Sequence, residues 1–435
     1  MNNTIVNEEG HLVFGGVDTV RLAEQYGTPL FVYDVARIRK NARAFVRTFK
    51  DRGMKAQVAY ASKAFSSIAM LEVAKQEELS LDVVSQGELY TAIRAGYPMD
   101  KIHLHGNNKS LEELEMAVDH GIGCIVIDNF YEIDLLSAIL QEKKKTMNVL
   151  LRVTPGIEAH THDYILTGQE DSKFGFDLSS GQAELAYEKI AKVERMELIG
   201  LHCHIGSQIF ETSGFVMATN KLFEAMIKWK ETYGFTARVL NLGGGFGIRY
   251  TDDDAPLELD TYAHALIDEV QKLSDSAEYP VPEIWIEPGR AIVGDAAMTL
   301  YSIGSVKEIP GVRKYISVDG GMTDNLRPAL YQARYEAFVA NRMNEPVKEK
   351  VSVAGKCCES GDMLIWDVDV PSVTHHDILA VMSTGAYGYS MSNNYNRFPK
   401  AAVVFVEDGE HQLVIERESY EDLTRLDRSY ENRKG

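Results

Sequence analysis

The sequence predicts an α/β protein with two domains: a (β/α)8 TIM-like barrel over residues 30–290, and a mostly β domain over residues 291–435 that also takes in residues 1–29. Three observations predict this arrangement. From Leu30 onward, eight short apolar segments alternate with longer helical stretches. Several of these segments are continuously apolar, as expected of strands that are covered on both faces. After about Arg290, β-rich segments joined by Gly-, Pro- and Asp-containing turns replace the alternation.

The eight apolar segments are the expected barrel strands. Between them, the segment 88–95 places Leu89, Ala92 and Ile93 on one helical face, and 215–230 has a similar apolar stripe. Strands that alternate with helices imply parallel pairing with right-handed crossovers, and eight such units favour a closed barrel over an open sheet. The expected strands are 57–61, 81–84, 102–105, 124–127, 149–153, 199–204, 239–242 and 284–286.

The second domain is expected to be built mainly from strands. Before the barrel, the chain offers a short strand at 12–14 and a small helix at about 20–26. After the barrel, six apolar segments are bounded by turn residues and contain few helical patterns. These segments are 315–318, 351–354, 363–370, 378–382, 401–406 and 411–415.

Composition limits the kinds of partner and compartment. The 435 residues carry 45 Lys+Arg against 64 Asp+Glu, a net charge of −19, which argues against nucleic-acid and anionic-membrane partners and favours a small-molecule protein. Cys124, Cys203, Cys357 and Cys358 have neither the density of a disulfide framework nor the spacing of a zinc site. Without a basic-then-apolar start or an apolar run of membrane length, we expect a cytoplasmic protein.

Candidate catalytic and binding residues follow four of the expected strands, at the carboxyl ends where barrel active sites lie. Lys63 follows the first strand, and Glu287-Pro288-Gly289-Arg290 follows the eighth. His202-Cys203-His204-Ile205-Gly206-Ser207 follows the sixth strand, and Gly243-Gly244-Gly245-Phe246-Gly247 follows the seventh.

Lys63 and Glu287 should be neighbours, because the eighth strand of a closed barrel lies beside the first. Apolar neighbours such as Phe65 would desolvate the Lys63 amine and favour its neutral form, which attacks aldehydes to make a Schiff base. An ordinary solvated lysine is the alternative. Glu287 could form a plain ion pair, or it could keep a pyridine nitrogen protonated so that the ring takes up electrons. Arg290 could bind a phosphate or a carboxylate.

The other two segments suit a phosphate and an aromatic ring. Gly243, Gly244 and Gly245 present backbone amides that could wrap a phosphate, although a tight turn without a ligand is the alternative. His202 and His204 alternate on a strand; no third metal ligand accompanies them, so a stacking or core histidine is favoured and no metal is expected. Ser207 could donate to a phosphate. Together these residues describe a pyridoxal 5'-phosphate site.

The second domain adds three candidate segments. Cys357-Cys358-Glu359-Ser360-Gly361-Asp362 could present a thiol and a carboxylate, or simply two buried small side chains. Arg327 and Tyr331 lie four residues apart and could clamp a carboxylate, or form an exposed turn. Tyr387 lies in a glycine-flanked aromatic turn for which hydrophobic packing is the alternative.

Over nearly its full length the chain resembles the diaminopimelate decarboxylases, a family of alanine-racemase-like (fold type III) pyridoxal-phosphate enzymes. The resemblance rests on the segments named above and on several others. These are Tyr26-Gly27-Thr28-Pro29-Leu30, Tyr60-Ala61-Ser62-Lys63, Asp82-Val83-Val84-Ser85, Ser172-Lys173-Phe174-Gly175, Asp319-Gly320-Gly321-Met322 and Arg327-Pro328-Ala329-Leu330-Tyr331.

The resemblance implies a role for each candidate residue. In the catalytic and cofactor set, Lys63 is the lysine that holds the cofactor, His204 stacks on its ring and Glu287 pairs with its ring nitrogen. The phosphate is implied to lie on Ser207, Gly243, Gly244, Gly245 and Arg290, with Tyr387 near the cofactor. Cys358 is implied to be the catalytic proton donor from the partner subunit. The implied substrate ligands are Arg290, Arg327, Tyr331, Glu359 and Tyr387.

The resemblance also implies the reaction: meso-2,6-diaminopimelate loses carbon dioxide through an external aldimine and a quinonoid intermediate to give L-lysine, the last step of lysine biosynthesis. The implied assembly is a homodimer with shared active sites. Rival interpretations are an ornithine, arginine or carboxynorspermidine decarboxylase of the same fold, or a non-catalytic relative that binds the cofactor. The Arg327–Tyr331 pair and Glu359, where ornithine enzymes usually have Asp, favour diaminopimelate.

Overall fold

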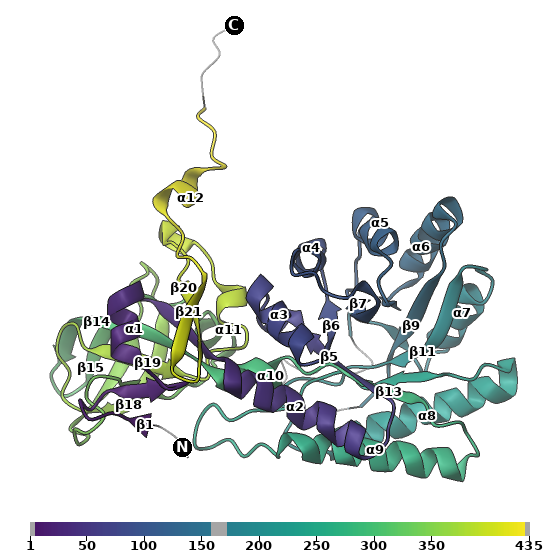
Figure 1. Cartoon of the computed structure of the whole chain (residues 1–435), viewed down its shortest axis with the longest axis horizontal. Helices are drawn as coiled ribbons and strands as arrows, with labels where there is room; N and C mark the ends of the chain where they lie inside the picture. Colours follow the sequence, from purple (N-terminus) through teal and green to yellow (C-terminus); the bar gives the residue numbers. More distant parts are fainter. Residues whose placement is uncertain (1–4, 158–171, 431–435) are drawn as a thin grey trace, which may run out of the picture. The chain divides into compact units, whose positions relative to one another are not determined.

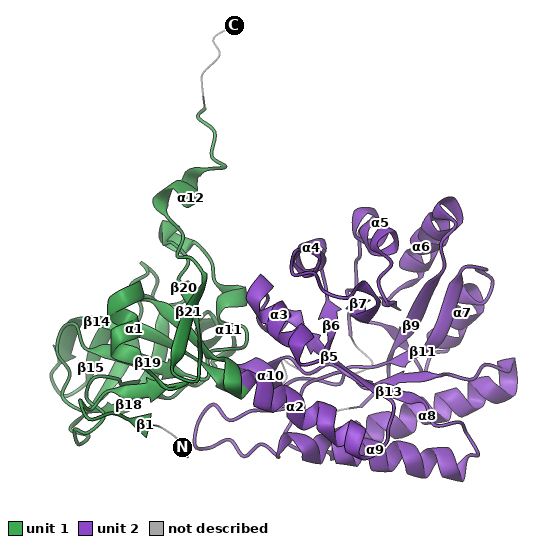
Figure 2. Cartoon of the chain, viewed as in Figure 1, with its two compact units in different colours: residues 1–37, 295–435 green, residues 38–294 purple. Residues whose placement is uncertain are grey.

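The computed structural model describes residues 5–157 and 172–430, and the chain divides into two compact units (Figure 2). Unit 2 comprises residues 38–294, and unit 1 comprises residues 1–37 and 295–435. The sequence predicts divisions at residues 30 and 290, and it therefore assigns residues 30–37 to the barrel domain rather than to the β-rich one. Among the described helices, none combines the length and the apolar composition needed to cross a lipid bilayer.

Unit 2 is a closed barrel of eight parallel strands with helices around it (Figure 1). Closure is complete because β13 pairs with β5 and β8 pairs with β9, so no strand edge is left to be protected. The predicted (β/α)8 barrel is therefore confirmed. In ladder order the strands are β5 (Ala56–Ala61), β6 (Ser80–Val83), β7 (Ile102–Leu104), β8 (Cys124–Ile127), β9 (Met147–Thr154), β11 (Met196–His202), β12 (Val239–Asn241) and β13 (Glu283–Ile286); a short β10 (Phe176–Asp177) adds to β9.

The barrel helices begin at capping residues that the sequence supplies. The side chains of Ser67, Ser85, Ser110 and Asn129 each accept a hydrogen bond from a backbone amide in the first helical turn. The two helices predicted from apolar stripes are confirmed as α4 and α8. The helices are α2 (Val35–Asp51), α3 (Ile68–Gln76), α4 (Gln86–Arg94), α5 (Leu111–His120), α6 (Phe130–Lys143), α7 (Gln182–Ile190), α8 (Ser213–Tyr233), α9 (Leu259–Ser276) and α10 (Arg290–Val293).

The barrel interior contains an apolar cluster and, towards the carboxyl ends of the strands, a set of charged side chains. Its apolar part includes Val126, Leu150, Val239 and Trp285, which belong to one buried cluster contributed by different strands. Because this part is filled by side chains, the barrel is a packed core rather than a channel. His103 stacks on Trp285 and contacts Gln57 in this same part of the barrel. The carboxyl ends of the strands gather a larger set of charged side chains, and that end holds the candidate site.

Unit 1 is mostly β, as predicted. Its main sheet runs β18-β17-β15-β14-β4-β20-β21, and β19 pairs with both β14 and β16. Its strands are β4 (Leu30–Asp34), β14 (Ala297–Ile309), β15 (Arg313–Val318), β16 (Ala337–Val339), β17 (Glu349–Ala354), β18 (Met363–Val370), β19 (Ile378–Met382), β20 (Ala402–Glu407) and β21 (Glu410–Ile415). A small sheet of β1 (Ile5–Val6), β2 (Leu12–Phe14) and β3 (Val17–Asp18) and the helices α1 (Thr19–Tyr26), α11 (Arg327–Tyr331) and α12 (Tyr420–Thr424) complete it.

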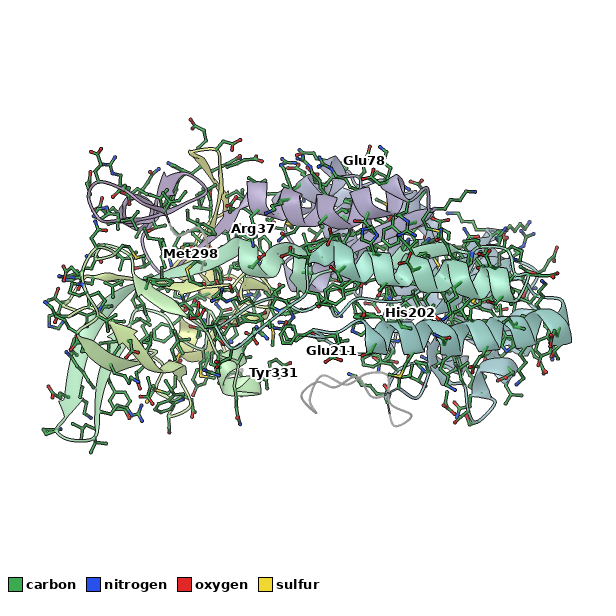
Figure 3. All side chains as sticks on the ribbon, turned by 90° about the horizontal axis from the view of Figure 1, so that it is seen from below. Arg37, Glu78, His202, Glu211, Met298 and Tyr331 are labelled. Atoms are coloured by element: carbon green, nitrogen blue, oxygen red, sulfur yellow. The ribbon has the colours of Figure 1, made fainter. Side chains whose placement is uncertain are left out.

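The N-terminal segment is part of unit 1, because β4 lies between β14 and β20 and pairs with both. The sequence analysis did not identify β14, although this strand is central to the sheet. Met298 lies in its first part (Figure 3), which is buried, whereas its second part is largely exposed. Ser302 and Gly304 interrupt its apolar run, so neither a continuous nor an alternating pattern extends over the strand.

Candidate active site

Lys63 lies in a 3₁₀ turn, η1 (Ser62–Ala64), directly after β5. Its neighbours Ala64 and Phe65 are buried, but Lys63 itself is exposed. The expectation that apolar neighbours desolvate its amine is therefore wrong. Lys63 still lies close enough to Asp82 and His204 for its charge to act on both groups.

Each of the eight barrel strands contributes a polar side chain at its carboxyl end, on the strand or just beyond it. All of these side chains except Lys63 are buried, so their charges must be balanced by one another. In ladder order from β5 they are Lys63, Asp82, His105, Asp128, Arg152, His202, Asn241 and Glu287.

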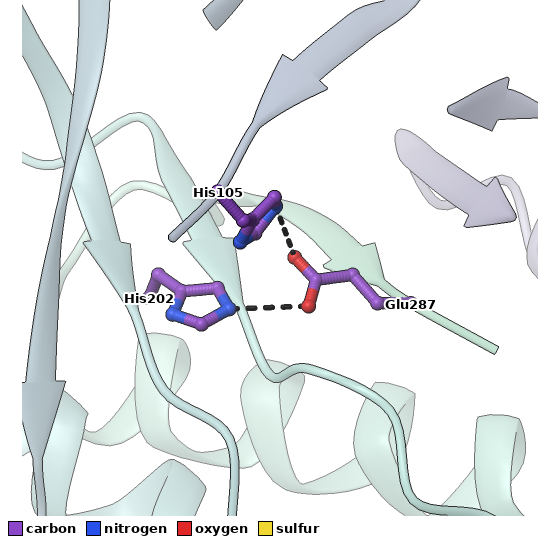
Figure 4. A group of neighbouring side chains, drawn as sticks. All are labelled: His105, His202 and Glu287. Atoms are coloured by element: carbon purple, nitrogen blue, oxygen red, sulfur yellow. Dashed lines mark hydrogen bonds and ion pairs between the residues drawn. The ribbon is translucent and has the colours of Figure 1, made fainter. Parts of the chain in front are cut away.

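Glu287, just beyond β13, contacts three other members of this set. His105 and His202 face its two carboxylate oxygens (Figure 4): His105 Nε2 lies 3.2 Å from Oε1, and His202 Nε2 lies 3.1 Å from Oε2. Asn241 Nδ2 donates to Oε1 at 2.7 Å. His105 Nε2 also lies 3.8 Å from Oδ1 of Asp82. A buried carboxylate is thus surrounded by three nitrogen groups from three different strands.

The pKa values of the two histidines are shifted in opposite directions. Burial alone would raise the pKa of Glu287, but His105 and His202 together hold it well below its usual value. Burial opposes the protonation of His105, yet the carboxylates of Asp82 and Glu287 outweigh it and raise its pKa. Burial lowers the pKa of His202 to about 4, so at neutral pH Glu287 is an anion and His202 is neutral, while the raised pKa of His105 favours its cationic form.

The expectation that His202 has no companions able to bind a metal is wrong. His105, His202 and Glu287 each offer a ligand atom, and these atoms lie within 4.8 Å of one another. The amide of Asn241 is directed at the same carboxylate, and Arg152 adds a positive charge that acts on both histidines. A proton on His105 and a cationic neighbour both oppose a metal ion at this position.

The triple-glycine turn after β12 packs against the segment that follows β11. Gly243 and Gly245 have φ values of 70° and 105°, which favour glycine, and a Cβ at Gly244 would lie only 2.1 Å from the carbonyl oxygen of Glu287. Two of the three amides are used within the site: Gly243 N donates to Asn241 Oδ1, and Gly244 N donates to His204 Nδ1 at 3.2 Å. For the amide of Gly245 we find no acceptor among the described residues.

The bond from Gly244 determines the tautomer of His204. A backbone amide can only donate, so Nδ1 must be an unprotonated acceptor and a neutral ring carries its proton on Nε2. Burial lowers the pKa of His204 well below its usual value, and the charges of Lys63 and Arg152 act in the same direction. His204 therefore presents a neutral imidazole. It lies two residues beyond the end of β11, whereas the sequence analysis placed it on the strand.

Arg290 is held beside the glycine turn by two hydroxyl groups. Its Nη2 donates to Ser207 Oγ at 2.9 Å, and its Nη1 donates to the hydroxyl of Tyr250 at 2.5 Å. Arg290 is buried, and Ser207 is partly exposed. Tyr250 was not among the predicted site residues; it follows the glycine segment by a few positions, which was the available signal.

These groups match the chemistry of pyridoxal phosphate. The dianionic phosphate suits a cationic guanidinium, a hydroxyl and a glycine amide, all contributed by segments that follow neighbouring strands β11, β12 and β13. The ring nitrogen suits the buried carboxylate of Glu287, and the ring face suits the neutral imidazole of His204. The residues that would hold the cofactor are therefore those of the strand ends in unit 2.

Arg152 on β9 completes the charge balance of the barrel end. Its Nε lies 3.8 Å from Oδ1 of Asp128, and its guanidinium lies 4.3 Å from the centre of the Phe174 ring. At Gly175, whose φ is 71°, a Cβ would lie 2.9 Å from the Arg152 carbonyl oxygen. The Ser172–Gly175 motif thus covers this arginine, which explains the aromatic residue and the glycine at these positions.

The residues that sequence reasoning missed share one signal. Asp82, Arg152 and Asn241 are polar residues inside strands that are otherwise apolar, and His105 follows such a strand directly. A polar side chain in a fully covered strand must point to a polar site or to a partner. A search for such polar residues in apolar strands would have found most of the buried polar side chains at the strand ends.

In unit 1, Arg327 is buried and Tyr331 is exposed. Arg327 Nη1 donates to the hydroxyl of Tyr335 at 2.7 Å, and its guanidinium carbon lies 5.9 Å from the centre of the Tyr387 ring. Tyr331 lies at the end of α11 (Figure 3), and its exposed fraction is 45%. Tyr335, which sequence reasoning did not single out, is therefore the phenol that positions Arg327.

The loop between β17 and β18 presents Cys358 and Glu359 to the surface, where both are exposed. Asp362 anchors the loop by accepting hydrogen bonds from the amides of Met322 and Cys357, at 2.6 and 2.8 Å. Burial and the neighbouring Asp362 carboxylate raise the pKa of Cys357 to about 12. Of the two adjacent cysteines, Cys358 is thus the one with an accessible thiol.

The chain is similar to known proteins over nearly its whole length. A family model described as "Pyridoxal-dependent decarboxylase, pyridoxal binding domain" matches residues 35–294. The diaminopimelate decarboxylase of Bacillus subtilis is 62% identical over 97% of this chain and 96% of its own length, and that of Halalkalibacterium halodurans is 65% identical over the same shares. The crystal structure of diaminopimelate decarboxylase from M. jannaschii in co-complex with L-lysine superimposes with a TM-score of 0.93 at 35% identity, covering 99% of this chain and 98% of that one.

Proposed function

The chain belongs to the diaminopimelate decarboxylases, within the pyridoxal-dependent decarboxylase family, and we propose that it removes carbon dioxide from meso-2,6-diaminopimelate to release L-lysine. This is the last step of lysine biosynthesis. Two observations together carry the proposal. The chain is 65% identical to a diaminopimelate decarboxylase over 97% of its length, and its barrel holds a buried, ionised Glu287 beside a glycine turn and Arg290. That arrangement is what a pyridoxal-dependent decarboxylase requires.

When bound, pyridoxal phosphate supplies an aldehyde for the substrate amine and a ring that takes up the electron pair left by carbon dioxide. The chain's own residues hold it in place. We assign its attachment to Lys63, its phosphate to Ser207, Arg290 and the glycine turn, and its ring face to His204. Glu287 keeps a proton on the ring nitrogen.

The reaction also needs a proton at the carbon that loses its carboxylate. We assign this proton to the Cys358 thiol of a second copy of the chain in a homodimer, because Cys358 is exposed on a loop of unit 1. Glu359, also exposed on that loop, would bind the distal ammonium group of the substrate. The carbon–carboxylate bond breaks, a carbon–hydrogen bond forms, and the thiol is reprotonated from solvent.

The distal carboxylate distinguishes diaminopimelate from ornithine or arginine. We assign its recognition to Arg327 and Tyr331, with Arg290 and Tyr387 as further substrate ligands. Arg327 is buried and already held by Tyr335, so it is oriented before a ligand arrives. A substrate without the distal carboxylate would lack this charge-assisted contact, at a cost of about 1–3 kcal/mol.

We infer that the protein works in the cytoplasm without nucleic-acid or membrane partners. Its four cysteines are free thiols, as is usual in a reducing compartment. The net charge of −19 disfavours binding to nucleic acid or to an anionic membrane.

The direct test is a comparison of products from two substrates. The purified protein loaded with pyridoxal phosphate should release L-lysine and carbon dioxide from meso-diaminopimelate, and at most a trace of diamine from ornithine. Lys63→Ala should lose both the reaction and the absorbance band of the lysine-bound cofactor. Efficient turnover of ornithine would overturn the substrate assignment, and an unchanged band in Lys63→Ala would overturn the cofactor assignment.

A complementation experiment tests the shared site. Lys63→Ala and Cys358→Ala are each expected to be inactive, but in a mixed dimer one of the two sites combines an intact Lys63 with an intact Cys358. Random reassortment makes half of the dimers mixed, so about a quarter of wild-type activity should return. If both residues of a site come from the same subunit, mixing restores nothing.

A further inference from the structure

Glu287 has more partners than an acid that only faces a ring nitrogen needs. A carboxylate offers about four acceptor positions, two on each oxygen. His105 and Asn241 face Oε1, and His202 faces Oε2. Asn241 and His202 thus take one acceptor position on each oxygen, and the imidazole of His105 adds an ion-pair contact to Oε1.

The two histidines around Glu287 differ in their surroundings. His105 Nε2 lies between two carboxylates, 3.2 Å from Glu287 and 3.8 Å from Asp82, whereas His202 faces Glu287 alone. Nδ1 of His202 is buried with no hydrogen-bond partner among the described residues, so a proton there would gain nothing. The groups that face His105 are Asp82 on β6, Glu287 after β13, His202 on β11, Arg152 on β9 and His103 on its own strand.

We propose that His105 is a positioning residue: as the imidazolium between Asp82 and Glu287, it keeps Glu287 ionised, so that the proton shared with the cofactor rests on the ring nitrogen. His202 is the neutral donor that orients the other oxygen. This inference rests on the proposed cofactor site. It concerns two side chains that neither the sequence analysis nor the family resemblance assigned to that role.

The physical reason is the position of the charge. A cation 3.2 Å from the carboxylate stabilises the ionic pair of carboxylate and protonated ring over the neutral pair of carboxylic acid and unprotonated ring. In a buried site without that cation, the neutral pair is favoured, because desolvation disfavours both charges. His105 is thus expected to decide where one proton lies.

A matched pair of variants tests this role. His105→Gln and His202→Gln each replace a buried imidazole with a neutral amide donor of similar reach, but only the first removes a charge. The readout is the 15N chemical shift of the ring nitrogen in each protein loaded with 15N-labelled pyridoxal phosphate, without substrate. We expect His202→Gln to keep the shift of a protonated ring at pH 8, and His105→Gln to move it to that of an unprotonated ring.

The turnover numbers should follow the same order. We expect kcat for meso-diaminopimelate to fall about tenfold or more in His105→Gln, with KM changing less than kcat. If the two variants change the 15N shift of the ring nitrogen equally, the proposal is overturned. Loss of packing alone would affect both variants in the same way. Failure of the substrate assignment would instead appear as inactivity of the wild-type protein, with the ring-nitrogen shifts unaffected.

A second measurement needs no variant. A neutron crystal structure of the wild-type protein loaded with cofactor should show a deuteron on both nitrogens of His105 and on one nitrogen of His202. A single deuteron on His105 would overturn the proposal, and so would a metal ion bridging Nε2 of His105 and Nε2 of His202.

Discussion

Replacing Gly244 with alanine tests the glycine turn by steric means alone. The φ of Gly244 lies outside the left-handed region, so the added methyl group brings no backbone strain. Its Cβ would lie 2.1 Å from the Glu287 carbonyl oxygen, and reaching an ordinary contact of 3.4 Å needs a displacement of about 1.3 Å. The hydrogen bond from Glu287 N to Gly243 O, now 2.8 Å long, does not survive such a movement.

The expected cost follows from these two losses. Overpacking a dense interior costs about 1–3 kcal/mol, and the lost backbone bond adds about 0.5–1.5 kcal/mol. A total of about 1.5–4.5 kcal/mol corresponds to a Tm lower by about 3–18 °C in a unit of this size. Because Glu287 moves with the turn, added pyridoxal phosphate should also raise Tm less than it does in the wild-type protein.

The assay is thermal unfolding followed by circular dichroism, with and without added pyridoxal phosphate. Gly87→Ala is the matched control: Gly87 lies in α4, its φ is also outside the left-handed region, and the nearest atom to an added Cβ, Ser85 Oγ, is 3.7 Å away. It should leave Tm unchanged or raise it slightly. If Gly244→Ala melts within about 1 °C of the wild-type protein and responds equally to the cofactor, the steric reasoning is refuted.

Two further predictions concern buried charges outside the set of residues assigned to the cofactor. Burial raises the pKa of Asp324 to about 7, above its unfolded value, so the folded state binds the extra proton and stability falls as pH rises from about 4 to 7; Asp324→Asn should flatten this dependence and raise Tm at pH 8. A wild-type Tm that does not fall over that range would contradict this. Lys109, which donates to Glu132 at 2.7 Å and to two backbone carbonyls in the barrel, should cost about 3–5 kcal/mol when changed to alanine, as measured by urea unfolding. The control Lys143→Ala, which removes a surface pair with Asp119, should cost less than about 1 kcal/mol, and equal costs would contradict the burial argument.

Much of the fold could be predicted because the signal was local. Each of the eight barrel strands overlaps a predicted segment, since a strand covered on both faces is mainly apolar whatever its partners are. The segment 363–370 was predicted with the bounds that β18 has. β14 was missed because one half of it is buried and the other exposed, so its pattern depends on neighbours from β4, β15 and β19.

The sequence by itself determined which segments carry the chemistry: Lys63, the glycine turn and Glu287 follow strands whose order around the barrel is set by the chain. Only the tertiary structure decided which side chains meet and what charge each one holds. His105 and Glu287 are 182 positions apart, and closure of the barrel brings them within 3.2 Å. The physical reason is that strand pattern depends on each segment's own burial, whereas a protonation state depends on every charge within a few ångströms, whichever strand supplies it.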